Sequence, residues 1–234
     1  MTQHHLQNCD EENILWFQRR SFLQSAAVWL GTGGASAAFA DAKSNVVSSH
    51  GDVLVNGKPL LKGQAIYAGD AVNTGPQSGL VVVMGTSAFQ IRPNTKLVFD
   101  GNVSTYLISA LRLINGAVVS VWGKGKDRSI VTPTLVAGIR GTGVYTEVLE
   151  QQDNRSYFCT CYGSVELKAG TDKTISTTEY HEAFWAEPSA KAGKFITPAK
   201  MLNHSDEELE YLAKLVDQKT AWQISGSKLH QENY

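Results

Sequence analysis

Short apolar segments alternate with turn residues from Val53 to about Lys168. Each segment is rich in β-branched or aromatic residues and is bounded by Gly, Asn, Asp or Pro, which is typical of short strands joined by tight turns. The segments read VLVNG, LVVVMG, FQIRP, KLVFDG, LRLINGAVVSVWG, SIVTP, GVYTEVLE and SYFCTCYGSVELKAG. No helical period separates them, which argues against a parallel βαβ arrangement. The pattern predicts an all-β fold of stacked short strands, either a sandwich or a β-helix-like body.

A helical pattern replaces the strand pattern near the C-terminus. Ser205 and Glu208 have the spacing of a capping box, and the two acidic residues between them suit the positive end of a helix dipole. Apolar residues then recur at helical spacing, at Leu209, Leu212, Ala213 and Val216. These features predict a helix at about 205–217 within a C-terminal extension of residues 169–234.

The first forty residues have the pattern of an export signal. Arg19 and Arg20 precede an uncharged run that ends in Ala-Phe-Ala at Ala40, a small-x-small cleavage box. The arginine pair, followed by Ser-Phe-Leu, is similar to the twin-arginine signal, the address of proteins exported in the folded state. Residues 1–40 are therefore interpreted as a twin-arginine-type signal peptide, with Asp41 as the first mature residue and the periplasm as the destination.

Two other interpretations of this run are an uncleaved membrane anchor and an amphipathic helix of a cytosolic protein. The glycines within the run weaken either helix, and the run is less apolar than a spanning segment requires. No other segment is long and apolar enough to cross a bilayer, so we expect no transmembrane segment after signal removal.

The balance of charge argues against one class of partner. Of 21 basic and 22 acidic residues, two and three respectively lie in residues 1–40, so residues 41–234 carry 19 of each sign. Nucleic-acid-binding proteins concentrate Lys and Arg on one face, so we expect no nucleic-acid partner. Of three cysteines, Cys9 lies in the signal. The remaining two are too few for the disulfide framework of a small secreted domain.

Four groups of residues, in chain order, resemble the FecR domain. They are GQAI with GDAVNTG at 63–75, LRL with NGAV at 111–118, VTPT with GIRGT at 131–142, and YGSVEL at 162–167. The resemblance covers about Gly51 to Lys168 and defines a FecR-like β domain at 41–168. It implies an extracytoplasmic all-β module of a family whose named members relay iron-siderophore uptake to a sigma factor. Those regulators keep a transmembrane helix, whereas this chain has a short signal, so we expect a soluble binding or sensing module with an envelope protein partner.

Cys159 and Cys161 are the most informative pair in the mature chain. On a strand, residues i and i+2 face the same way with Cα atoms about 6.6 Å apart, whereas a disulfide needs Cβ atoms about 3.8 Å apart. Two thiolates on one face can instead converge on a metal ion. Free cysteines also pack as small apolar side chains. A metal site, packed thiols and a strained disulfide therefore remain as three interpretations.

Two histidines are candidates to complete a metal site. His181 lies in EYHEAFW, after the last strand signal, and His204 lies just before the predicted helix. Taken singly, each is more simply a polar surface residue. The order Cys-x-Cys-Tyr-Gly, a later His, and Asn-His-Ser/Thr-Asp-x-Glu-Leu resembles a subset of FecR-like proteins. Packing of the helix against the β body would bring His204 near Cys159 and Cys161. The resulting hypothesis is a Cys₂His₂ site for zinc, iron or copper.

We therefore expect a non-enzymatic module that binds a transition metal. One alternative is a metal-free β scaffold for envelope protein interactions, with Cys159 and Cys161 merely packed. Another is a thiol-dependent enzyme in which His181 activates one of these cysteines. The glycine-rich segment GIRGTG is not expected to bind a nucleotide, because no helix follows it to receive the phosphate.

Overall fold

The computed structural model describes residues 44–102, 106–125 and 128–226. The chain divides into two units, Met1–Asp41 and Ala42–Tyr234, and every described residue belongs to the second. The signal peptide predicted for residues 1–40 lies outside the described residues and stays a prediction.

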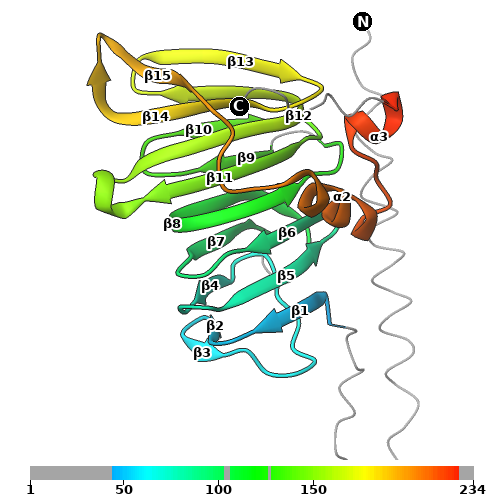
Figure 1. Cartoon of the computed structure of the whole chain (residues 1–234). Helices are drawn as coiled ribbons and strands as arrows, with labels where there is room; N and C mark the ends of the chain where they lie inside the picture. Colours follow the sequence, from blue (N-terminus) through cyan, green and yellow to red (C-terminus); the bar gives the residue numbers. More distant parts are fainter. Residues whose placement is uncertain (1–43, 103–105, 126–127, 227–234) are drawn as a thin grey trace, which may run out of the picture. The chain divides into compact units, whose positions relative to one another are not determined.

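Fifteen strands and two short α-helices form the described part of the second unit (Figure 1). The strands are β1 (Val46–His50), β2 (Val53–Val55), β3 (Lys58–Pro59), β4 (Ala71–Thr74), β5 (Gly79–Met84), β6 (Ser87–Ile91), β7 (Lys96–Gly101), β8 (Ile108–Val121), β9 (Arg128–Val131), β10 (Val136–Ile139), β11 (Gly143–Leu149), β12 (Arg155–Ala169), β13 (Asp172–Thr178), β14 (Glu182–Lys191) and β15 (Lys194–Ala199). The helices are α2 (Asp206–Leu215) and α3 (Ala221–Ser225). The predicted all-β fold with a small C-terminal helical part is confirmed. Neither helix has the length and apolarity needed to cross a bilayer.

Two long strands each belong to both layers of a sandwich. Residues 108–115 of β8 pair with β7 and β9, whereas residues 116–121 pair with β6 and β11. In the same way, residues 155–162 of β12 pair with β11 and β14, and residues 163–169 pair with β10 and β13. In Figure 1 the strands are stacked roughly in chain order, from β1–β3 at one end to β13–β15 at the other.

A glycine stands where each long strand passes from one layer to the other. Gly116 in β8 has φ 84° and Gly163 in β12 has φ 94°, values that favour glycine over other residues. A Cβ atom at Gly163 would lie 2.5 Å from the Thr142 Cγ2 atom, and one at Gly116 would lie 2.4 Å from the Thr95 Oγ1 atom. Both corners therefore require glycine for conformation and for space.

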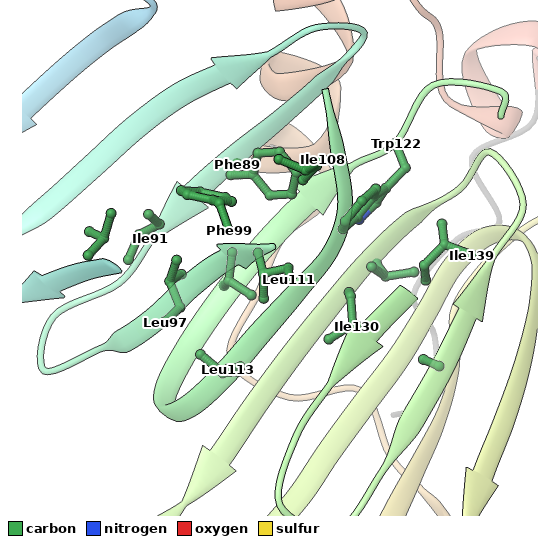
Figure 2. Close-up of a cluster of buried hydrophobic side chains, with 14 of the residues drawn as sticks. Phe89, Ile91, Leu97, Phe99, Ile108, Leu111, Leu113, Trp122, Ile130 and Ile139 are labelled. Atoms are coloured by element: carbon green, nitrogen blue, oxygen red, sulfur yellow. The ribbon is translucent and has the colours of Figure 1, made fainter. Parts of the chain in front are cut away.

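The main apolar core lies between the two layers (Figure 2). Phe89 of β6 meets Phe99 of β7 with ring centroids 5.3 Å apart, and it meets Trp122 edge-on at 5.0 Å. All three side chains are fully buried. Close contact of aromatic rings across the layers contributes packing energy beyond the area buried, so these rings help to fix the spacing of the sandwich.

A second apolar cluster lies on the outer face of one layer, beneath the helices. From the helices it contains Leu209, Leu212, Ala213 and Trp222, and from the strands it contains Val81, Ala88, Val119, Val121, Tyr145, Tyr157, Cys159 and Cys161. Helix α2 contacts β6 and β8, and it begins at the predicted N-cap Ser205 with the capping box to Glu208 in place. The C-terminal segment therefore folds back over the sheet, as the metal-site hypothesis requires.

Strand pairing continues well past Lys168, where the sequence pattern indicated no further strand. β13, β14 and β15 all lie within the C-terminal segment and extend both layers. In β13 only Ser176 is buried, so the strand lacks the apolar alternation by which the earlier strands are recognised. Its position is set by pairing with the second half of β12 rather than by its own hydrophobicity.

Candidate metal centre

Cys159 and Cys161 project from the face of β12 that lies beneath the helices. The intervening Thr160 and the preceding Phe158 point the other way, and Phe158 belongs to the core between the layers. Both cysteines are 0% exposed, and both are free thiols. Because β11 and β14 flank this part of β12 on either side, the two sulfur atoms are held by a strand in the middle of its layer. The same-face placement predicted from the i, i+2 spacing is present.

His181 lies between β13 and β14, where the chain reverses direction. Its φ angle is 28°, which is unusual for a residue other than glycine. Its backbone N–H donates to the Cys161 carbonyl at 3.0 Å, and this bond fixes the histidine beside β12. Its Nδ1 atom lies 3.5 Å from the Cys159 Sγ atom. The imidazole is therefore aimed at the sulfur, and its side chain is only 5% exposed.

His204 comes from the segment between β15 and α2. Its Nε2 atom lies 3.4 Å from the Cys161 Sγ atom and 3.2 Å from the Nδ1 atom of His181. Its ring stacks on Tyr145 of β11 with centroids 4.7 Å apart. Its Nδ1 atom lies 2.6 Å from the Leu202 carbonyl oxygen, which suits an Nδ1–H donor and leaves Nε2 free to bind a metal.

The four predicted residues thus converge at one place. The Sγ atoms of Cys159 and Cys161, Nδ1 of His181 and Nε2 of His204 all lie within 4.8 Å of one another. They come from three chain segments: β12, the β13–β14 connection and the approach to α2. A Cys₂His₂ group of this kind can hold a transition-metal ion. His50 is not part of the group; it is exposed on β1.

Asp206 supports the group from the first residue of α2. Its Oδ1 atom lies 2.9 Å from the Nε2 atom of His181, and its Oδ2 atom accepts a hydrogen bond from the Tyr180 hydroxyl at 3.1 Å. A carboxylate that receives the second ring N–H of a histidine fixes the tautomer and orientation of a metal ligand. From the sequence, Asp206 is assigned to the helix dipole and to the Asn-His-Ser-Asp motif, but not to the support of His181. The signal that could have found this role was its position two residues after the candidate ligand His204.

Trp222 of α3 covers the centre from the helix side. Its indole stacks on the His181 imidazole with centroids 5.7 Å apart, and Tyr162 and Tyr180 meet it edge-on at 5.5 Å each. Its Nε1–H donates to the Glu210 carboxylate at 2.7 Å. Trp222 is 3% exposed, so the aromatic side chains enclose the cluster in a dry environment in which charge interactions are strong.

The environment sets the protonation of the cluster. Burial disfavours the Cys159 thiolate, but hydrogen bonds with Cys161 and with the imidazoles of His181 and His204 outweigh it and hold the pKa of Cys159 well below its usual range. Burial and the neighbouring Cys159 sulfur together raise the pKa of Cys161 well above its usual range. For His181, burial favours the neutral ring, but Cys159 and Asp206 outweigh it and raise the pKa. These shifts favour the thiolate form at Cys159 and the thiol form at Cys161.

Comparison with known proteins adds little to this description. No protein-family model matches the sequence, and no curated protein matches it. Two crystal structures of a protein from Parabacteroides distasonis ATCC 8503, described as a "putative anti-sigma factor" and determined at 1.65 and 2.50 Å, are similar with a TM-score of 0.44 and 9% identity. The match covers 55% of this chain, which spans 58% of that protein. A likeness of this size carries no argument about the role of this chain.

Proposed function

We propose that this chain is an exported, FecR-like binding module that holds a transition-metal ion between Cys159, Cys161, His181 and His204. The observation that carries the proposal is the convergence of these four ligand atoms within 4.8 Å from three separate segments. The FecR assignment rests on the ordered motifs between Gly51 and Lys168, and export rests on the arginine pair and the Ala-Phe-Ala box.

The contacts around the histidines favour metal binding over simple packing of the thiols. Both cysteines belong to an apolar cluster, but each sulfur atom also faces an imidazole nitrogen, which simple packing does not require. Each imidazole has its other nitrogen held by an oxygen atom, of Asp206 for His181 and of Leu202 for His204. Such outer partners are the usual supports of metal-bound histidines. The left-handed backbone at His181 costs about 1–3 kcal/mol. Backbone strain of this kind is concentrated at functional sites, as expected for a residue that binds a ligand.

The ion would join the C-terminal segment to the β layers. Cys159 and Cys161 belong to the sheet, whereas His204 lies just before α2 and Asp206 is the first residue of that helix. Metal binding would therefore stabilise the docked position of the helices. We assign the module to binding or sensing with an envelope protein partner, as the FecR resemblance implies. We assign no catalysis, because a nucleophilic cysteine needs access to substrate and both sulfur-bearing residues are fully buried.

Elemental analysis tests the proposal. The full chain is produced in its native host, recovered without chelators and compared with the double variant Cys159→Ser, Cys161→Ser and with His50→Ala, a matched loss of a histidine outside the cluster. We expect about one equivalent of a transition metal in the wild type and in His50→Ala, and almost none in the double variant. A metal-free wild type would overturn the proposal. It would favour the scaffold role, in which the double variant keeps its fold and its partner.

A further inference from the structure

Three of the six distances between the ligand atoms can be compared with those of common coordination geometries. With metal–sulfur bonds of about 2.3 Å and metal–nitrogen bonds of about 2.05 Å, a tetrahedron separates sulfur from nitrogen by about 3.6 Å and two nitrogens by about 3.3 Å. Adjacent positions of a square plane with the same bonds would be about 3.1 Å and about 2.9 Å apart. The two sulfur–nitrogen distances are 3.5 and 3.4 Å, and the nitrogen–nitrogen distance is 3.2 Å. All three match the tetrahedron more closely than the square plane.

The charge of the donor set points to a dication. Metal-bound Cys159 and Cys161 would contribute two negative charges from fully buried side chains, and the carboxylate of Asp206, in contact with His181, adds a third. A divalent ion neutralises the two thiolates, whereas a monovalent ion leaves a net negative charge among the ligands beside that carboxylate. Uncompensated charge in a buried site is costly, so the donor set disfavours copper(I).

Four protein side chains are available to fill the four positions of a tetrahedron. Trp222 stacks over His181, and Tyr145 stacks against His204, so aromatic rings pack against both imidazoles. Catalytic zinc sites keep one position for water or substrate, whereas structural sites use four protein ligands. The arrangement in this chain is therefore that of a structural zinc site. Tetrahedral S₂N₂ donor sets are typical of zinc and of iron–sulfur centres, while copper(II) and nickel(II) prefer tetragonal geometry. Four donor atoms within 4.8 Å of one another suit a single ion, which favours zinc.

We propose that the site selects a divalent ion of tetrahedral preference, zinc, and holds it as a closed four-coordinate centre without an exchangeable ligand. This inference rests on the proposed function, which requires only that some transition metal binds. It deepens that function by assigning a structural role to the ion and by identifying the ion as zinc rather than copper.

Cobalt(II) is the probe, because its visible spectrum reports coordination geometry directly. The full chain is reduced, stripped of metal under anaerobic conditions and titrated with cobalt(II), and then with zinc(II). We expect intense visible bands of tetrahedral cobalt and a sulfur-to-cobalt charge-transfer band, both saturating at about one equivalent and bleached by about one equivalent of zinc. His204→Ala should weaken and shift the bands, whereas the matched variant His50→Ala should leave them unchanged.

Other outcomes separate the two proposals. Faint bands of six-coordinate cobalt, or bands that zinc does not bleach, would overturn the zinc assignment. Stoichiometric retention of copper(I) with no binding of cobalt or zinc would also overturn it and would leave the proposed function standing. Failure to bind any of these three ions or iron(II) would sink the proposed function itself.

Discussion

The Nε2 atom of His181 lies 2.9 Å from the Oδ1 atom of Asp206. This contact joins the β13–β14 connection to the first turn of α2, and it does so through a residue whose other ring nitrogen faces a cysteine sulfur. Ligand orientation and helix docking therefore depend on the same pair of side chains. Changes on the helix should be detectable at the metal, and removal of the metal should be detectable at the helix.

Asp206→Asn should weaken metal binding without abolishing it. The amide cannot supply the negative charge that orients and polarises His181, and loss of such a partner costs about 10–100-fold in metal affinity. Glu207→Gln is the matched control, because Glu207 is an exposed acidic residue of the same first turn. Competition with a chelator of known affinity measures both variants. Equal losses in the two would assign the effect to the helix dipole and contradict a specific role for Asp206.

Metal removal should loosen the C-terminal helices and lower thermal stability. A ligand present at 100 times its Kd stabilises the folded state by about 2.7 kcal/mol, which corresponds to a Tm shift of about 5–10 °C in a domain of this size. Chelation should also change the fluorescence of Trp222, which stacks on His181, and Trp222→Phe should remove that change. A Tm that falls equally in the Cys159→Ser, Cys161→Ser variant would show that the chelator acts elsewhere.

Metal affinity should increase with pH. An ion binds thiolates and neutral imidazoles, so any proton on these groups must leave. The pKa of Cys161 is raised above its ordinary value of 9.0 by burial and by the Cys159 sulfur, and that of His181 is raised from 6.5 because Cys159 and Asp206 outweigh its burial. Both shifts favour the protonated, metal-free state at lower pH. Each displaced proton changes the apparent affinity about tenfold per pH unit.

Chelator competition between about pH 6 and 8 measures this slope. The release of protons on metal addition, followed with an indicator in weak buffer, checks it independently. An affinity that is constant over this range would mean that both thiols are already ionised and His181 is already neutral in the metal-free protein, which contradicts the shifts at Cys161 and His181.

Gly163→Ala should destabilise the sandwich more than Gly193→Ala. Both glycines have positive φ, 94° and 77°, but a Cβ at Gly163 would meet Thr142 at 2.5 Å whereas one at Gly193 meets nothing within 4 Å. The conformational cost, about 1–3 kcal/mol, is common to both, and the steric clash affects only Gly163. Urea unfolding compares their free energies of unfolding. Equal losses would show that β12 can shift at this corner without cost.

Export can be tested separately from metal binding. Replacement of Arg19 and Arg20 by lysine should leave the full-length precursor in the cytosol, because the twin-arginine route reads the arginine pair. Cell fractionation and N-terminal sequencing of the exported protein check this, and the wild type should begin at Asp41. Export of the lysine variant at the wild-type level would exclude this route.

The parts of the site that follow from local periodicity could be predicted from the sequence. The shared face of Cys159 and Cys161 follows from strand geometry, and the start of α2 follows from Ser205 and Glu208. Strand β13 could not be recognised because its sequence is polar, and the positions of β13–β15 depend on pairing with other strands. The contact of His181 with Asp206 depends on the positions of these strands, so it could not be predicted from the sequence and was found only in the structure.

His204 is the last ligand along the chain, 43 residues after Cys161. The four donors cannot meet until the ribosome has delivered His204, so capture of the proposed ion would follow synthesis of β1–β15. If the protein crosses the inner membrane already folded, capture precedes translocation. The ion found in the envelope would then report the metal supply of the cytosol at the time of synthesis, not that of the compartment in which the protein resides.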